Sequence, residues 1–303
     1  MYEEYWGLKE KPFENTPDPR FTYYSQQHEE ALARMMYAVH GHKGAALLTG
    51  DYGCGKTLLS RVLWDELQKE RLYQTVSILD PRLSGIQLLQ EILYQMSNSP
   101  APRGKINLFH SLYKILYSNH SKGEHTVIVV DEAQSIRNKN IFEELRLLLN
   151  FQLNNSFLLT IVLLGSPELR EIIASIPQLA QRMAVSYHIR HLNEKELVEY
   201  INHRLKVAGA ERNIFSEDIY KDIYLASGGV PRRINTICDL ALLIGFGTGA
   251  KLVDKTTIAK VKADMEFHAV SAEEDIEVPH PADDFRSGER LEEDAIPNLN
   301  ERL

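Results

Sequence analysis

The sequence of 303 residues has little cysteine, no long apolar run and no surplus of positive charge. Its two cysteines, Cys54 and Cys238, are too few for a disulfide framework, and Cys54 is expected to be a neutral filler, with a redox role as the alternative. No run approaches the ~20 apolar residues that a membrane-spanning helix needs. No basic and apolar signal peptide opens the chain. We therefore expect a cytoplasmic protein that does not span a membrane.

The net charge of −8 is concentrated at the end of the chain. Residues 271–303 contain eleven acidic and three basic side chains, so the rest of the chain is formally neutral. Nonspecific affinity for nucleic acid depends on Lys and Arg side chains that displace counterions from phosphates, and a neutral body argues against it. The acidic segment has three prolines and few aromatics. It is predicted either to be disordered or to dock on a partner.

Residues 50–57 read Gly-Asp-Tyr-Gly-Cys-Gly-Lys-Thr, an unbroken G-x-x-x-x-G-K-[ST] phosphate loop. The loop follows the apolar run 45–49 and precedes the helical run 58–67, the context that the motif requires. Its glycines let backbone N–H groups turn inward around a β-phosphate, while Lys56 is expected to contact the β- and γ-phosphates and Thr57 to hold Mg²⁺. A glycine-rich turn with a chance lysine is the alternative. The predicted nucleotide contacts of the loop are Gly50, Asp51, Tyr52, Gly53, Cys54, Gly55, Lys56, Thr57 and Leu58.

An acidic pair follows a second apolar run. Residues 126–130 are β-branched and suit a buried parallel strand, which delivers Asp131 and Glu132 at its carboxyl end. Open α/β sheets bind their ligands at that edge. Asp131 is expected to coordinate Mg²⁺, directly or through water, and Glu132 to polarise an attacking water. The alternative is that the pair caps a helix.

Between residues 45 and 189, strand-like runs alternate with helical periodicity, which indicates a parallel sheet covered by helices on both faces. The expected strands are 45–49, 74–79, 126–130, 157–164 and 185–189. The expected helices between them are 56–70, 85–96, 107–117, 140–152 and 168–174. After residue 192 only helical signals continue. We therefore divide the chain into an N-terminal arm with the first helix (1–43), an α/β nucleotide-binding domain (44–191), a helical lid domain (192–268) and an acidic tail (269–303).

The N-terminal arm contains the aromatics Tyr5, Trp6 and Phe13, and its prolines prevent a long helix. We expect these aromatics to pack the arm against the nucleotide domain rather than to stack on bases. Residues 8–21 lie close enough in sequence to the phosphate loop to border the adenine of a nucleotide.

Several short motifs occur in a fixed order along residues 1–268. They are Tyr5-Trp-Gly-Leu8, Lys11-Pro-Phe13, Pro17-Asp-Pro-Arg-Phe21, the phosphate loop, Asp131-Glu-Ala-Gln134, Gly165-Ser-Pro-Glu-Leu169, Leu179-Ala-Gln-Arg182 and Gly228-Gly-Val-Pro-Arg-Arg-Ile-Asn235. In this order the sequence resembles the ExeA/GspA family of AAA+ ATPases. These are general-secretion-pathway and pilus-associated ATPases, similar in turn to transposition ATPases of the Mu and TniB type. The resemblance implies an α/β P-loop NTPase with a parallel five-stranded sheet and a C-terminal helical lid.

The resemblance assigns roles to two arginines. Arg182 corresponds to the arginine finger that reaches the γ-phosphate of a neighbouring subunit, and Arg232 to the sensor 2 arginine that touches the nucleotide from the lid. Ser166 falls in the sensor 1 region, where relatives often carry Gln, so the sensor 1 residue stays open. A permanently charged guanidinium suits phosphate oxygens. The alternatives are that Arg182 is a solvated helix residue and Arg232 a helix-capping surface cation.

The resemblance also implies a function. We expect an AAA+ ATPase that binds and hydrolyses Mg-ATP, forms a hexameric ring or filament, and drives or regulates assembly of a secretion or pilus-type envelope machine. The alternative is an ATP-dependent regulator of transposition that binds duplex DNA. That alternative requires a basic stripe along the inner face of the assembly, for which the candidates are Lys105, Lys114, Lys122, Arg137 and Lys139.

Overall fold

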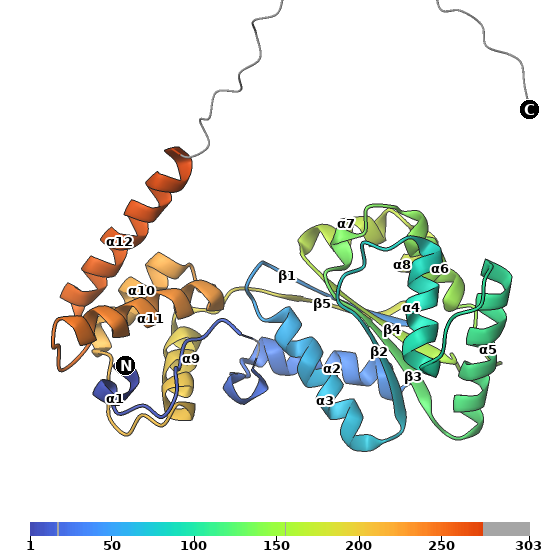
Figure 1. Cartoon of the computed structure of the whole chain (residues 1–303), viewed down its shortest axis with the longest axis horizontal. Helices are drawn as coiled ribbons and strands as arrows, with labels where there is room; N and C mark the ends of the chain where they lie inside the picture. Colours follow the sequence, from blue (N-terminus) through green and yellow to red (C-terminus); the bar gives the residue numbers. More distant parts are fainter. Residues whose placement is uncertain (17, 155, 275–303) are drawn as a thin grey trace, which may run out of the picture. The chain divides into compact units, whose positions relative to one another are not determined.

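The computed structural model describes residues 1–16, 18–154 and 156–274. Its centre is one sheet of five parallel strands in the order β2-β3-β4-β1-β5 (Figure 1). This confirms the predicted α/β fold with a five-stranded parallel sheet. The strands are β1 (Ala45–Gly50), β2 (Tyr73–Ile78), β3 (His125–Val130), β4 (Leu159–Gly165) and β5 (Met183–Ile189).

The three inner strands are buried at every residue, as expected where helices cover both faces of a parallel sheet. Alternate residues of β1 contribute to opposite cores: Leu47 joins one apolar cluster and Leu48 the other. The register pairs Leu47 with Leu163 and Leu48 with Leu164, so neighbouring strands add to the same two layers. The sheet therefore holds the carboxyl ends of its strands on a rigid double core.

Helices from two parts of the chain cover the two faces (Figure 1). Met35 and Leu63 belong to the apolar cluster on one face of the sheet. Leu88, Leu108 and Phe142 belong to the apolar cluster on the other face. The first face carries α2 (Gln26–His40) and α3 (Lys56–Glu70). The second carries α4 (Gly85–Ser97), α5 (Lys105–Ser121) and α6 (Asn140–Leu148), with α7 (Pro167–Ala174) and α8 (Pro177–Ala180) beside them.

The expected end of helix α6 and the expected start of strand β4 were wrong. The helix predicted over 140–152 ends at Leu148, because the chain turns back there: Gln152 pairs antiparallel with Phe157. Strand β4 accordingly begins at Leu159 and not at residue 157. The sequence pattern missed this turn because its apolar residues continue the helical spacing.

The chain after β5 is helical, as predicted. The capping box is confirmed, since the Asn193 side chain accepts from the Glu196 N–H at 3.0 Å and the Glu196 carboxylate accepts from the Asn193 N–H at 2.9 Å. The elements are α9 (Glu194–Val207), η3 (Glu217–Ile219), α10 (Tyr220–Ser227), α11 (Pro231–Gly247) and α12 (Lys255–Glu274). Helix α12 continues six residues into the predicted tail 269–303, and residues 275–303 lie outside the described residues.

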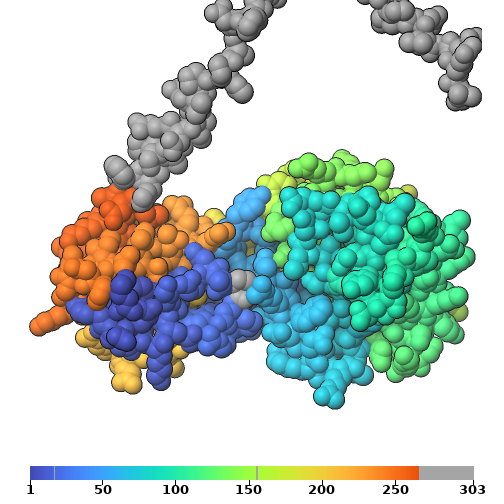
Figure 2. Space-filling view, viewed as in Figure 1, coloured from blue at the N-terminus to red at the C-terminus, as the bar shows by residue number. Residues whose placement is uncertain are grey.

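The arm aromatics Trp6 and Phe13 pack on the helical region, so their expected packing against the nucleotide domain was wrong. Helix α1 (Tyr2–Trp6) lies beside α11, where the Trp6 indole N–H donates to the Leu242 carbonyl at 2.9 Å. Tyr2 donates to Asp239, on the same helix. Gly245 leaves room for the indole, since a Cβ there would lie 2.7 Å from Trp6 Cζ2. Figure 2 shows the blue arm lying against the orange helical residues. A buried indole needs an acceptor, and α11 supplies it.

Candidate functional site

The phosphate loop joins β1 to α3 and has the backbone that its glycines allow. Gly53 and Gly55 have φ of +79° and +89°, values that side chains with a Cβ rarely adopt. Gly50 is needed for a different reason, since a Cβ there would lie 2.8 Å from the Ile189 carbonyl oxygen of β5. Gly55 is the N-cap of α3, so the positive end of that helix faces the loop.

Lys56 is buried although it carries a charge, and its exposed fraction is only 6%. Its ammonium donates to the carbonyls of Gly50 at 2.8 Å and Asp51 at 2.9 Å, so the side chain curls back into the loop. The Tyr52 ring lies 5.8 Å from the same ammonium and is largely exposed. The loop thus concentrates one cation and the start of a helix at a single point, the arrangement that binds phosphates.

Asp131 lies at the carboxyl end of β3 and is also buried. It hydrogen-bonds with the Thr57 side chain and accepts from the Glu132 N–H at 2.9 Å. Burial raises the pKa of this carboxyl above its ordinary value. A buried carboxylate next to a hydroxyl is an oxygen donor set that suits a hard divalent cation, because the cation offsets the cost of burying the charge.

Glu132 follows in a left-handed backbone conformation, with φ of +49°. The Gln134 side-chain N–H donates to Glu132 Oε2 at 2.6 Å. The Gln134 side-chain oxygen accepts from the Ser166 N–H at 3.1 Å. Non-glycine residues with positive φ are uncommon and cost of the order of 1–3 kcal/mol, and they cluster at functional sites. Gln134 belongs to the Asp131-Glu-Ala-Gln134 motif, but the sequence predicts no role for it. Nothing in the local pattern predicts that it bridges β3 and β4.

A cavity of about 620 Å³ opens beside these groups. It brings together the loop residues Lys56 and Thr57, the carboxylate Glu132 and the predicted lid residue Arg232. Loop and lid are in close contact, since a Cβ on Gly53 would lie 3.1 Å from Arg232 Cβ. The other described residues that line the cavity are Glu14, Asn15, Thr16, Tyr52, Gly53, Gly55, Leu58, Tyr200, Arg204, Val230, Pro231, Arg233 and Asn235.

Part of the N-terminal arm borders this cavity. Glu14, Asn15 and Thr16 line it, so the expectation that residues 8–21 border an adenine stays a prediction for these three positions. Trp6 and Phe13 instead pack into the helical region, where Phe13 meets Phe215 with ring centroids 6.0 Å apart. The polar residues of the arm, rather than its aromatics, therefore face the site.

Arg204 of α9 fixes the arm at the cavity, and sequence analysis missed it. The guanidinium is buried and donates to the carbonyls of Pro12 at 2.5 Å and Glu14 at 3.0 Å, and to the Tyr200 hydroxyl at 2.9 Å. It also lies 5.0 Å from the Phe21 ring centroid. These partners are up to 192 positions away along the chain, so no local pattern could reveal them.

Arg182 is placed away from this cavity. Its guanidinium donates to the Leu149 carbonyl at 2.6 Å and to Asn150 Oδ1 at 2.7 Å. Arg182 lies just before the amino end of β5. The phosphate loop lies after the carboxyl end of β1, which is parallel to β5, so Arg182 and the loop are at opposite edges of the sheet. The seven residues of β5 separate these two edges of the sheet by roughly 20 Å.

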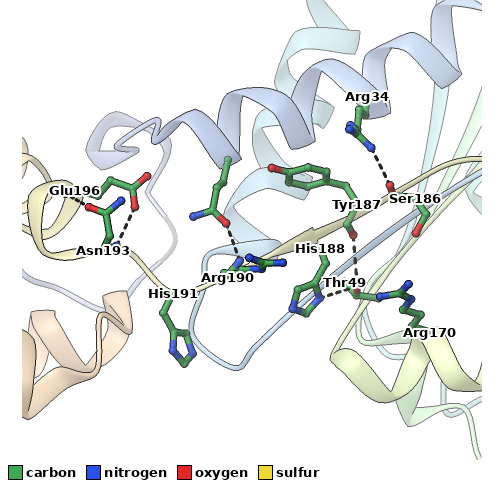
Figure 3. Close-up of a pocket in the computed structure, with 11 residues that line it drawn as sticks. Arg34, Thr49, Arg170, Ser186, Tyr187, His188, Arg190, His191, Asn193 and Glu196 are labelled. Carbon is green, nitrogen blue, oxygen red and sulfur yellow. Dashed lines mark hydrogen bonds between the residues drawn. The ribbon is translucent and has the colours of Figure 1, made fainter.

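A second cavity, of about 590 Å³, lies along the edge strand β5 (Figure 3). Its lining is basic, and Glu196 is the one carboxylate that the described residues contribute to it. The cations are Arg34, Arg170 and Arg190, joined by the imidazoles of His188 and His191. The stripe expected from Lys105 to Lys139 did not include them, and Lys105 itself pairs with Glu144 at 2.6 Å.

Comparison with known proteins agrees with this geometry. Residues 39–173 match the family model described as "AAA domain". Together with the phosphate loop and the sheet order, this defines the class: a P-loop NTPase fold with an AAA nucleotide-binding domain.

The sequence comparison narrows the class. The chain is 37% identical over 254 residues to "General secretion pathway protein A" of Aeromonas hydrophila. The match covers 82% of this chain, which spans about half (46%) of the length of that relative. The chain is a GspA/ExeA-like AAA domain protein, as the ordered motifs predicted.

Solved structures share the fold at low sequence identity. The ORC2 protein of Aeropyrum pernix, in its ADPNP-ADP complexes, aligns with a TM-score of 0.61 and 16% identity, over 84% of this chain and 71% of that one. Drosophila ORC bound to DNA aligns with a TM-score of 0.66 and 18% identity, over 88% and 66%. RuvB of Thermotoga maritima aligns with a TM-score of 0.52 and 18% identity, over 78% and 68%. At these identities the likeness shows the fold alone.

Within the described residues, no helix has both the length and the apolar character that crossing a membrane requires.

Proposed function

We propose that this protein is an ATPase that binds Mg-ATP in the cavity between the phosphate loop, the arm and α11. One observation carries the proposal: Lys56, Thr57 and Glu132 line one cavity although they come from separate segments of the chain, and Asp131 is hydrogen-bonded to Thr57. Each supplies a different requirement of phosphoryl transfer, namely charge, cation binding and water activation.

Nucleotide binding is assigned to the loop and the lid. The backbone N–H groups of residues 50–58 receive the β-phosphate, and the Lys56 ammonium exchanges its two loop carbonyls for phosphate oxygens. The loop's proposed contacts are those predicted from sequence, Gly50 through Leu58. Arg232 adds a guanidinium from α11, and its proximity to Gly53 supports the sensor 2 role.

Thr57 and Asp131 have the donor set to hold Mg²⁺, since the structure already joins the hydroxyl to the buried carboxylate. When bound there, Mg²⁺ neutralises charge on the phosphate oxygens. Glu132 accepts a proton from the attacking water as the general base. Gln134 holds the Glu132 carboxylate by one hydrogen bond and is itself held by the Ser166 N–H.

Arg182 is assigned to the site of a neighbouring subunit, because it lies about 20 Å along the sheet from the loop of its own chain. An active protein is then an oligomer in which each subunit completes the next site, and we propose a hexameric ring or a filament. Similarity to General secretion pathway protein A supports a role in driving or regulating assembly of a secretion or pilus-type envelope machine.

The Glu132→Gln variant tests the enzymatic proposal. It should bind ATP as tightly as wild type and lose turnover by ~10²–10⁴, the usual contribution of a general base. Lys56→Ala should lose ATP binding itself. Unchanged hydrolysis by Glu132→Gln would show that Glu132 is not the general base. Unchanged ATP binding by Lys56→Ala would contradict ATP binding at the phosphate loop.

The Glu132→Gln variant, which should hold ATP without hydrolysing it, also tests the proposed partner proteins. It should be recovered with secretion or pilus assembly proteins from cells that make them, and it should show no ATP-dependent retention on duplex DNA across a salt series. ATP-dependent DNA retention without those proteins would favour the transposition-regulator alternative.

A further inference from the structure

Three side chains of different chemistry lie close together at the phosphate loop. The ligand atoms of Asp51, Cys54 and His191 all lie within 4.8 Å of one another, and His191 Nε2 is 3.3 Å from Asp51 Oδ2. Two of these residues belong to the loop, and the third lies on the chain that leads from β5 to α9. In Figure 3 the His191 ring turns away from Asn193 and Glu196.

We propose that these three side chains form a binding site for a thiophilic divalent cation of the zinc type. Thiolate, imidazole and carboxylate are the ligands that zinc takes in proteins. Tetrahedral bonds of 2.0–2.3 Å place ligand atoms roughly 3.3–3.8 Å apart, so closing the site from a 4.8 Å spread needs side-chain movements of about 1–1.5 Å. The proposal does not rest on ATP hydrolysis.

The surroundings hold Cys54 in place and leave access for a fourth ligand. The Cys54 carbonyl accepts from the His28 ring at 3.0 Å, and the other ring nitrogen of His28 lies 2.6 Å from the Ser25 hydroxyl. Cys54 is buried, whereas the side chains of Asp51 and His191 are each about 40% exposed. Water can therefore enter as a fourth ligand from the side of Asp51 and His191.

The alternative is that Cys54 only fills the core. It does contact the apolar cluster of α2 and α3, and burial raises the pKa of its thiol to about 11. Its sulfur nevertheless faces a carboxylate and an imidazole on one side, which no apolar filler requires. A cation there replaces the thiol proton and neutralises the thiolate.

This site differs in chemistry and consequence from the proposed Mg²⁺ site. Thr57 and Asp131 offer only oxygen, which suits Mg²⁺, while Cys54 and His191 favour a softer ion. A bound cation would link the phosphate loop to the segment that joins the sheet to the helical region. Opening of the loop then requires dissociation of the cation, so the site couples metal supply to loop mobility.

Cobalt(II) provides the test, because its absorption reports ligation by a thiolate. When one equivalent of Co²⁺ alone is added to the nucleotide-free 303-residue protein, a sulfur-to-cobalt charge-transfer band should appear, and Zn²⁺ should displace the Co²⁺. Cys54→Ser should abolish the band. His191→Gln should weaken Co²⁺ binding at least about tenfold, since even changes beyond the ligands cost 10–100-fold.

Two variants serve as matched controls. Cys238→Ser alters the second cysteine, buried in α11, and His188→Gln alters the histidine three residues before His191. Both should keep the band. A wild-type protein without the band, a band that survives Cys54→Ser, or an unchanged Co²⁺ affinity in His191→Gln would overturn the proposal.

ATP binding separates this result from the proposed enzymatic function. His191→Gln should still bind ATP, measured in the same preparation, which also shows that the variant is folded. Weakened Co²⁺ binding by His191→Gln together with retained ATP binding supports a separate cation site. Failure of wild type to bind ATP would instead contradict the proposed function and leave the cobalt measurement valid.

Discussion

The Gln134 side-chain amide donates to Glu132 Oε2 at 2.6 Å, and its carbonyl oxygen accepts from the Ser166 N–H at 3.1 Å. One glutamine thereby joins the carboxylate after β3 to the first residue after β4. Space around it is limited, since a Cβ on Gly165 would lie 2.5 Å from Gln134 Oε1. The orientation of Glu132 is therefore tied to the end of the neighbouring strand.

We predict that Gln134→Ala reduces kcat about tenfold and leaves ATP affinity unchanged. A free Glu132 carboxylate keeps its chemistry but loses part of its orientation, so the loss should be smaller than the ~10²–10⁴ expected for Glu132→Gln. Single-turnover hydrolysis at saturating ATP, with a separate binding isotherm, measures both quantities. Equal kcat in wild type and Gln134→Ala would show that Gln134 does not position the base.

Arg182→Ala should leave ATP affinity of the isolated subunit unchanged and sharply reduce hydrolysis by the oligomer, because a trans arginine contributes ~10³–10⁵ in rate. Mixing it with Lys56→Ala is the decisive measurement. In mixed assemblies an intact site can receive Arg182 from a subunit that cannot bind ATP, so activity should partly return. No recovery at any ratio, in assemblies shown to mix, would exclude action in trans.

Arg204→Met should lower the free energy of unfolding by about 2–4 kcal/mol, because it removes three hydrogen bonds from a buried guanidinium. It should also weaken ATP binding, since Glu14 lies at the cavity and its carbonyl accepts from Arg204. Urea unfolding and ATP titration measure the two effects.

Arg20→Met is the matched control, because Arg20 is exposed and pairs with Asp18 and Glu10 on the surface. Its stability cost should be clearly smaller than that of Arg204→Met, because exposed ion pairs are screened by water. A similar cost for both substitutions would mean that Arg204 does not fix the arm.

The protein should lose stability in mild acid through His125. Burial lowers the pKa of this imidazole to about 3, and it stacks on His42 with ring centroids 4.1 Å apart. Thr160 gives its hydroxyl proton to the Lys43 carbonyl, so His125 Nε2–H donates to Thr160. The pKa of His125 is about 3 in the folded protein and about 6.5 in the unfolded chain. Between pH 3 and pH 6.5 the unfolded chain therefore binds one proton more than the folded protein does, which favours unfolding. Stability is retained above pH 6.5 and falls as the pH decreases toward 3.

At 1.36 kcal/mol per pH unit, His125 should cost of the order of 2 kcal/mol between pH 6.5 and pH 5. His125→Gln keeps an N–H donor and cannot titrate. The difference in unfolding free energy between pH 7 and pH 5 should therefore be about 2 kcal/mol smaller in this variant than in wild type. The exposed His110→Gln should behave as wild type does. An unchanged difference in His125→Gln would refute the assignment.

The sequence could predict what is encoded locally. The phosphate loop, the β3 strand with Asp131 and the capping box at Asn193 each depend on fewer than about ten consecutive residues, and the structure contains all three. Gln134 and Arg204 escaped prediction because their partners are distant: Ser166 is 32 positions from Gln134, and Pro12 is 192 from Arg204. The packing of the arm on α11 depends on the space at Gly245, which composition cannot show.

The position of Trp6 gives the protein a built-in optical probe. The chain has two tryptophans, and they lie in different environments: Trp6 is buried against α11, while Trp64 is half-buried on α3, directly after the phosphate loop. Detachment of the arm would free the Trp6 indole N–H to water and shift its fluorescence to longer wavelength. A Trp64→Phe protein would report that event alone, without any attached dye.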